Sequence, residues 1–311
     1  MLGIPYMGSK RKIAKELMDY MLANTPNATA FYDLFGGGAA MSMEALKRPQ
    51  LKKVVYNELD TRITELLKKI QKDGVTEEFY AWVDRETFKA RVDEQSWFGG
   101  LLAICWSFGN NSEKGYLFST ENEKLKKPLH NFVVYKDLEA QKEFESITGV
   151  ELPLWILDKQ SIRLRRLALY EYLRGLGKRL DLTELEGLQQ LERLQQLERL
   201  QQLERLQQLE GLEISNLSYE SVNIQTPPEE TIIYLDPPYE KTAKYQKTID
   251  YDALFEYIRS SPYKVYISSY DMPFFECKAI EHRSTLSPTN KKKVFEKLFC
   301  NREEWDKGIL F

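Results

Sequence analysis

Short apolar runs that end in polar or glycine-rich turns form the main pattern of this chain. They occupy residues 30–34, 54–56, 231–235 and 263–267, and their length and β-branched content predict buried strands. Apolar positions with helical spacing follow the first run, to about residue 47, and also cover residues 13–22. The pattern predicts an α/β fold, in which ligands collect beyond the carboxyl ends of parallel strands.

The run at 231–235 leads into Asp236, Pro237, Pro238 and Tyr239, which together suit the binding of an exocyclic amine. Such an amine is a weak nucleophile because its lone pair is delocalised, and two hydrogen-bond acceptors would localise that pair. Asp236 and the Pro237 carbonyl can be those acceptors, on a turn that proline stiffens. Tyr239 can stack on a base. An ordinary Pro-Pro turn after a strand is the structural alternative.

Glycines at positions 36, 37 and 38 follow the first strand and let the backbone approach a ligand closely. This kind of turn serves nucleotides, flavins, nicotinamides or plain packing. Its usual companion is an acidic residue about 20 positions on, after a second strand, that holds ribose hydroxyls. Glu58 has that spacing, so the two strands predict half of a dinucleotide or S-adenosylmethionine site. A solvated glutamate at a helix cap is the alternative.

Composition limits the class of protein. With 311 residues, 42% of them hydrophobic, the chain can form one large core or two domains. It has no apolar stretch of transmembrane length and no signal-peptide pattern, which predicts a soluble, cytoplasmic protein that does not bind membranes. Three scattered cysteines and two histidines predict neither a disulfide framework nor a metal site. The net charge of −3 requires that any DNA-binding surface be a local basic patch.

Residues 73–181 contain the best candidates for nucleic-acid contact. Asn110, Asn111 and Lys114 lie in a glycine-containing segment whose polar side chains suit a DNA groove, with plain turn residues as the alternative. Residues 161–179 are rich in basic side chains, and we expect phosphate contacts there. A solvated helix face is the other interpretation. The stripe includes Arg163, Arg165, Arg166, Arg174, Lys178 and Arg179.

From residue 182 to residue 212, leucine recurs at every third position, and a Leu-Glu-Arg-Leu-Gln-Gln hexad is repeated almost verbatim. Leucines three apart would spiral around an α-helix, and strand alternation fits no better. We therefore favour a small solenoid, with an irregular or self-associating α-helix as the alternative. A spacer or stabilising element is the simplest role, and self-association or contact with another protein is the other.

Seven motifs together resemble the Dam-type, alpha-group DNA adenine-N6 methyltransferases and their bacterial and phage relatives. They span most of the chain, with the cofactor motifs before a long insert and the Asp-Pro-Pro-Tyr motif after it. They are YMGSK at 6–10, DLFGGGAA at 33–40, NELD at 57–60, WSFGNN at 106–111, DPPY at 236–239, SSYDMP at 268–273 and EKLF at 296–299.

This resemblance implies a Rossmann-like sheet that binds S-adenosylmethionine, interrupted by a mainly helical target-recognition domain for double-stranded DNA. The implied domains are residues 1–72 and 213–311 for catalysis, 73–181 for recognition and 182–212 for the repeat. Asp236, Pro237, Pro238 and Tyr239 would hold the target adenine. The implied cofactor contacts are Tyr6, Lys10, Asp33, Phe35, Gly37, Glu58 and Asp236. Ala39 and Glu58 depart from the residues that relatives often have at these places.

The implied activity is site-specific transfer of a methyl group to adenine N6, as in restriction-modification systems. The same acceptor geometry would suit adenine in RNA or the amine of cytosine. A DNA-binding or scaffold protein that keeps the fold without catalysis is a further alternative.

Overall fold

The computed structural model describes residues 3–4, 10–110, 115–179, 194–206, 209–238, 249–269, 272–283 and 293–302. The chain forms two compact units. The first, which we call the sheet unit, comprises Met1–Gly3, Gly8–Lys68 and Gln208–Phe311, and the second, the helical unit, comprises Ile4–Met7 and Lys69–Gln207. The predicted domain limits at residues 72 and 212 lie near these borders.

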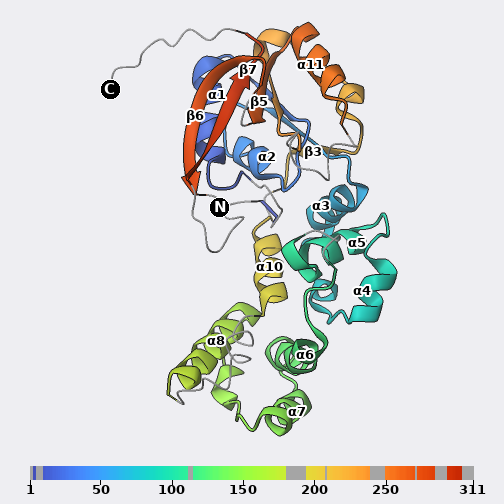
Figure 1. The fold of residues 1–311 in the computed structure, drawn as a ribbon, viewed down its shortest axis with the longest axis vertical. Coiled ribbons are helices and arrows are strands. Elements are labelled where there is room, and N and C mark those ends of the chain that lie inside the picture. Colours follow the sequence, from blue (N-terminus) through green and yellow to red (C-terminus); the bar gives the residue numbers. More distant parts are fainter. Residues whose placement is uncertain are drawn as a thin grey trace. The chain divides into compact units, whose positions relative to one another are not determined.

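The sheet unit is built on a seven-stranded sheet with the order β3-β2-β1-β4-β5-β7-β6 (Figure 1). β3, β2, β1, β4 and β5 are parallel neighbours, and β7 runs antiparallel to both β5 and β6. This is the Rossmann-like α/β sheet that the sequence predicted. The strands are β1 (Ala30–Asp33), β2 (Lys53–Asn57), β3 (Leu212–Ser215), β4 (Thr231–Leu235), β5 (Lys264–Ser269), β6 (Phe275–Arg283) and β7 (Lys293–Cys300).

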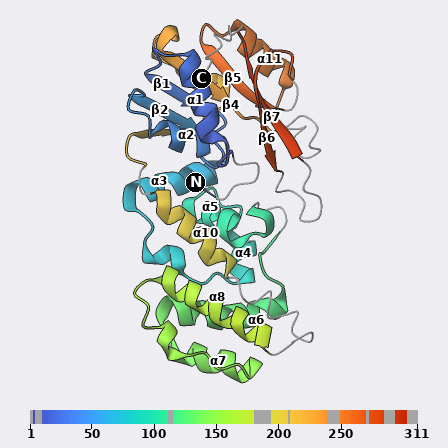
Figure 2. The same cartoon turned by 90° about the vertical axis from the view of Figure 1, so that its left-hand side faces the viewer.

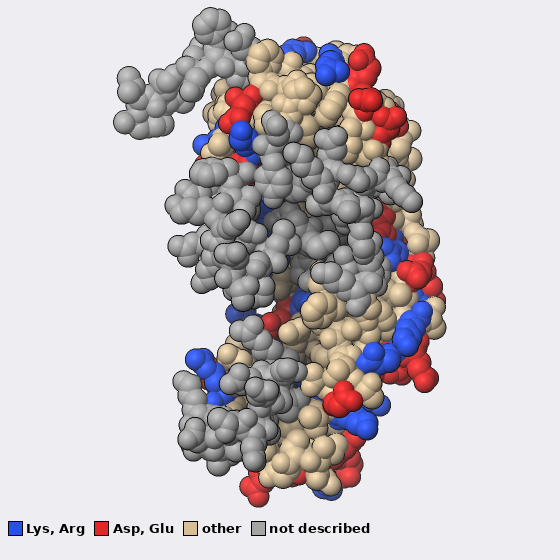
Figure 3. All heavy atoms as spheres, viewed as in Figure 1, with Lys and Arg blue, Asp and Glu red and all other residues tan. Residues whose placement is uncertain are grey.

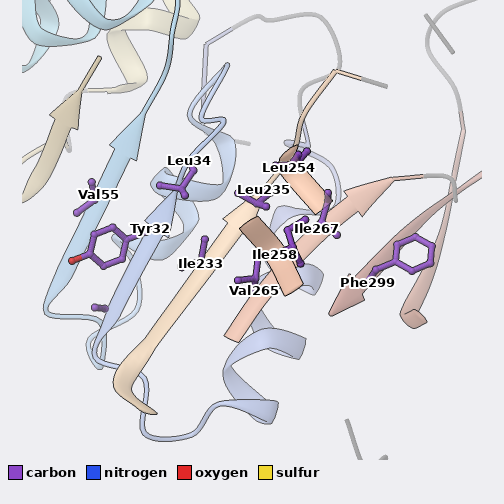
Figure 4. Packing of buried hydrophobic residues seen from close by; sticks show 11 residues of the cluster. Tyr32, Leu34, Val55, Ile233, Leu235, Leu254, Ile258, Val265, Ile267 and Phe299 are labelled. Atoms are coloured by element: carbon purple, nitrogen blue, oxygen red, sulfur yellow. The ribbon is translucent and has the colours of Figure 1, made fainter. Parts of the chain in front are cut away.

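Helices cover both faces of this sheet. On one face, Leu254 and Ile258 of α11 (Tyr251–Ser260) pack against apolar side chains of β4 and β5 (Figure 4). On the other lie α1 (Ala14–Asn24) and α2 (Ala40–Ala45) (Figure 2). All residues of β1 and β4 are buried, which explains why these strands are continuous apolar runs without alternation.

Four helices of the helical unit, α4, α5, α6 and α7, begin at capping side chains. Asp84, Ser96, Ser119 and Asp137 each accept a hydrogen bond from an N–H group in the first turn of the helix that follows. α3 (Thr61–Asp73) crosses the border between the units. The other helices are α4 (Arg85–Arg91), α5 (Trp97–Leu101), α6 (Thr120–Tyr135), α7 (Leu138–Thr148), α8 (Ile162–Arg179) and α10 (Gln195–Leu203), and a π-helix spans Leu102–Trp106.

A buried histidine lies at the centre of the helical unit. The His130 ring packs against the rings of Trp82 and Trp106, its Nε2 donates to the Tyr80 carbonyl at 2.8 Å, and its Nδ1 lies 3.4 Å from the Gln196 amide nitrogen. Burial lowers the pKa of His130 to about 4. His130 is therefore a neutral core residue at physiological pH.

The described part of the leucine repeat is helical. α10 is followed by a 3-10 turn at Glu204–Leu206, so the solenoid prediction is wrong for residues 194–206 and the helical alternative is correct there. Leucines three apart drift by about 60° per step around an α-helix. The helical unit accommodates this drift by enclosing α10, since Gln196 and Gln201 are buried together with Leu194, Leu197, Leu200, Leu203 and Leu206.

The described part of the repeat does not form a compact unit of its own. Its residues up to Gln207 belong to the helical unit, and its last leucine, Leu212, is the first residue of β3. In the described residues the hexads are thus part of the core and not a protruding spacer. Residues 182–193 and 207–208 of the repeat lie outside the described residues.

Candidate active site

Three acidic residues meet at the carboxyl edge of the sheet. Asp33 ends β1, Glu58 follows β2 and Asp236 follows β4. The parallel register pairs Asp33 with Tyr56 on one side and with Tyr234 on the other, so the three strands end at the same level. This edge is where an α/β sheet binds its ligands.

The glycine turn after β1 is shaped by Tyr56. A Cβ on Gly36 would lie 2.1 Å from the Tyr56 ring, so only glycine fits there. The Tyr56 hydroxyl donates to the Gly37 carbonyl at 2.8 Å, and the Gly37 N–H donates to Glu58 Oε2 at 2.8 Å. The structure therefore joins the glycine turn directly to the acidic residue that the spacing selected. Burial raises the pKa of Glu58, while hydrogen bonds from the Asp60 and Gly37 N–H groups oppose the rise.

Ala39, one of the two departures from the family pattern, lies in the left-handed region with φ 57°. An L-residue with a Cβ pays roughly 1–2 kcal/mol for this conformation, which explains why glycine would suit the position. The methyl group of Ala39 is fully buried and offsets part of this strain. The turn is kept without the additional glycine.

Asp33 is buried and only half paired. Its Oδ2 accepts from the Ser42 hydroxyl at 2.7 Å, whereas its Oδ1 is buried with no hydrogen-bond partner in the part of the chain that the structure describes. Burial raises the pKa of Asp33 to about 7, and the negative charges of Asp236 and Glu58 add to the rise. An unpaired buried acceptor in an acidic site suits a cationic or hydrogen-bond-donating ligand.

Lys10 lies between two carboxylates. Its Nζ is 2.7 Å from Asp236 Oδ1 and 3.4 Å from Glu296 Oε1. The side chains of Lys10 and Glu296 are 6% and 3% exposed, and that of Asp236 is 19% exposed. Burial raises the pKa of Asp236 to about 6, Lys10 opposes the rise and Glu296 adds to it.

The structure brings together most of the residues that the sequence selected for this site. Lys10, Asp33, Gly37, Glu58 and Asp236 share the carboxyl edge through the contacts above. Pro237 is buried directly beside Asp236, and the Pro238 carbonyl accepts from the Tyr251 hydroxyl. The Phe35 ring is 5.4 Å from the Tyr219 ring. Tyr6 and Tyr239 lie outside the described residues.

Two members of the cluster were not among the predicted site residues. Ser42, on α2, orients Asp33, and Glu296, on β7, contacts Lys10. Glu296 could have been found from the strand pattern, because it shares a face with Leu298 and Cys300, both buried. A carboxylate in an inward position of a strand requires a partner.

The predicted phosphate-contacting stripe is smaller than expected. Arg165 is buried and donates to the carbonyls of Val133, Val134 and Lys159, where it caps the end of α6. The Arg166 guanidinium is 2.7 Å from Glu198 on α10 and is 12% exposed. Both arginines are thus bound within the helical unit, because their positions on α8 face α6 and α10. Arg163 is exposed.

The segment around Asn110 is described only in part. Trp106 and Ser107 are buried, and the backbone of Ser107 forms an isolated antiparallel β-bridge with that of Tyr116. The backbone of Asn110 ends a short turn at Phe108–Asn110, and Asn111 and Lys114 lie outside the described residues. On the described atoms of the helical unit seen in Figure 3, basic and acidic side chains are intermixed.

Neither a metal cluster nor a membrane-spanning helix is present among the described residues. No group of three or more His, Cys, Asp or Glu side chains could hold a metal ion there. None of the helices in the described ranges is long and apolar enough to cross a membrane.

Residues 6–145 match a family model described as D12 class N6 adenine-specific DNA methyltransferase. The matched span contains Lys10, the glycine turn and Glu58, and it ends before Asp236. No curated protein matches this chain.

Proposed function

Because residues 6–145 match the family model of the D12 class N6 adenine-specific DNA methyltransferases, we propose that the carboxyl edge of the sheet is where the methyl donor and the target adenine meet. The observation that carries the proposal is the contact between Lys10, from the matched span, and Asp236, from the turn after β4. This contact joins the two halves of the chain that bear the cofactor and adenine motifs.

The amine of adenine is activated by two acceptors. Among the described residues, the Asp236 carboxylate is hydrogen-bonded to Lys10 through Oδ1, so Oδ2 is the acceptor proposed for one amine proton. The Pro237 carbonyl would accept the other, and proline offers no N–H that would compete. Localising the lone pair and holding it in line with the methyl group provide most of the catalysis, and the surplus proton leaves after transfer. Tyr239 is proposed to stack on the base.

S-adenosylmethionine is the proposed donor, and the residues at the edge fit a cationic group. In the described part of the chain, Asp33 Oδ1 is a buried acceptor without a hydrogen-bond partner, and the contacts above bring four carboxylates and one ammonium group, that of Lys10, to this edge. When bound, the cofactor supplies a methyl group on positively charged sulfur. Glu58 is proposed to bind the ribose, and Lys10 and Gly37 to line the pocket. A bound cation would lower the raised pKa values of Asp33 and Asp236, so cofactor affinity should fall as the pH drops through about 7 to 6.

Double-stranded DNA is the proposed substrate, within the cytoplasm. A duplex hides the amine in its base stack, so the adenine must be flipped out, which costs a few kcal/mol. The helical unit is proposed to recognise the target sequence, with Arg163, Asn110, Asn111 and Lys114 as DNA contacts.

The proposal is tested by transfer of labelled methyl from S-adenosylmethionine to unmethylated DNA, followed by nucleoside digestion. Wild-type protein should form N6-methyladenine, Asp236→Ala should not, and Asp252→Ala, at an exposed aspartate of the same unit, should behave as wild type. Label in cytosine, or in RNA but not in DNA, would replace the proposed substrate. Cofactor and DNA binding without any transfer would favour the scaffold alternative.

A further inference from the structure

Glu296 has no role in the chemistry proposed above, yet it lies beside it. Its side chain is 3% exposed and 3.4 Å from Lys10, on a strand whose inward neighbours Leu298 and Cys300 are buried. Burying a carboxylate is unfavourable unless a partner compensates for the lost hydration. A hydrophobic residue at this position would pack against the same neighbours without that penalty, so stability alone does not explain a glutamate.

The geometry points to Glu296 as a positioning residue that holds the Lys10 ammonium beside one oxygen of Asp236 and leaves the other oxygen to accept from the substrate amine. This inference rests on the role proposed for Asp236. With a single carboxylate as partner, a buried lysine would move to share both oxygens of Asp236. A second carboxylate, 3.4 Å from the ammonium, holds it at two contacts instead of one.

The charges around Lys10 support this arrangement. Asp236 follows β4, Glu296 comes from β7, and Asp33 ends β1 on the other side of Asp236. The Tyr234 hydroxyl, which is hydrogen-bonded to Ser268 of β5, also lies in this field, and burial keeps its pKa well above the ordinary value, so it is neutral. Glu296 raises the pKa of Asp236 and Lys10 lowers it. Removing the charge of Glu296 therefore makes Asp236 a weaker base and pairs it more tightly with Lys10.

The test compares Glu296→Gln with a matched control on the neighbouring strand. Glu276→Gln removes a glutamate that pairs with Lys297 at 2.8 Å, but this pair is on the surface, with side chains 45% and 33% exposed. Steady-state methyl transfer is measured from pH 5 to pH 9 for both variants and for Glu296→Asp. DNA and cofactor binding are measured separately.

For Glu296→Gln we expect kcat to fall about tenfold or more, which corresponds to roughly 1.4 kcal/mol. The KM for DNA and cofactor should change less than about threefold, and the acid limb of the kcat profile should move to lower pH, because Glu296 raises the pKa of Asp236. Glu296→Asp keeps the charge at a greater distance from Lys10, so its acid limb should stay in place while kcat is intermediate. Glu276→Gln should match wild type.

Two results would overturn the inference. One is a Glu296→Gln protein with wild-type kcat and acid limb. The other, decisive if Glu296→Gln does not fold, is a Glu296→Asp protein whose kcat equals that of wild type, since a residue that only fills space and charge would tolerate the shorter chain. Asp236→Ala is assayed alongside: activity in that variant would refute the proposed function itself, whereas an inactive Asp236→Ala with a normal Glu296→Gln would refute the positioning role alone.

Discussion

Replacing Arg199 by alanine should destabilise the helical unit strongly, although Arg199 belongs to a repeat of nearly identical hexads. Arg199 lies on α10, and its Nη1 donates to Ser107 O at 2.7 Å, Cys105 O at 3.2 Å and Ile104 O at 3.4 Å. These carbonyls belong to the end of the π-helix and to the residue after it. Carbonyls at a helix end require such partners.

The size of the effect follows from these contacts. A hydrogen bond from a charged donor contributes about 1.5–3 kcal/mol, and one nitrogen has two hydrogens to give, so the gross contribution is about 3–6 kcal/mol. Burial of the guanidinium, which lowers the pKa of Arg199, opposes part of this gain. We expect a net loss of about 2–4 kcal/mol in the free energy of unfolding.

The matched control is Arg205→Ala, at the same place in the next hexad but exposed. That change should alter stability by less than about 0.5 kcal/mol. Urea unfolding followed by tryptophan fluorescence reports mainly on the helical unit, because that unit contains Trp82, Trp97, Trp106 and Trp155. Equal midpoints for the Arg199 and Arg205 variants would refute the reasoning.

Three further predictions use the same unit. Deleting one hexad, residues 188–193, leaves residues 194–212 intact and should shift Tm by less than about 2 °C. Deleting two hexads, residues 188–199, brings Gly187 to the place of Arg199 and should lower Tm by roughly 6 °C or more. Equal Tm values for the two deletions would contradict this prediction. The pKa of His130 is lowered to about 4, so its contribution to stability is present above pH 6.5 and is lost as the pH falls, by up to about 3 kcal/mol. Urea unfolding midpoints of wild type and His130→Gln at pH 7 and 4.5 measure this loss. An equal pH dependence in the two proteins would contradict it. Arg163→Ala should reduce the salt slope of DNA binding by about one, while Arg166→Ala should lower stability and leave the slope unchanged. The reverse result in a salt titration of DNA binding would show that Arg166, and not Arg163, contacts a phosphate.

The strands that position the site could be predicted from sequence because each is buried on both faces. Runs at 30–34 and 231–235 correspond to β1 (Ala30–Asp33) and β4 (Thr231–Leu235). Asp33, the last residue of β1, and Asp236, the residue after β4, lie at the carboxyl edge. Once the strands are known, parallel pairing brings their ends together. For this reason Glu58 and Asp236 were selected from the sequence pattern, whereas Asp33 was selected only through the family resemblance.

The roles of the arginines on α8 and the conformation of the leucine repeat depend on tertiary contacts, which the local sequence pattern does not encode. Arg165 and Arg166 have the same side chain as Arg163, and only the packing of α8 against α6 and α10 separates the two bound arginines from the exposed one. The three-residue leucine period disfavoured an α-helix because such a helix needs partners on most of its surface. The helical unit provides those partners around α10.

The most direct test of the central claim is single-turnover methyl transfer by Asp236→Ala with saturating S-adenosylmethionine and DNA, combined with separate measurement of both affinities. We predict that DNA is still bound, that cofactor affinity changes by less than about tenfold, and that the rate of transfer falls by at least about a thousandfold, as expected when an acceptor that acts in the transition state is lost. Transfer at a rate close to wild type would show that the carboxyl edge around Asp236 is not where the methyl group reaches adenine.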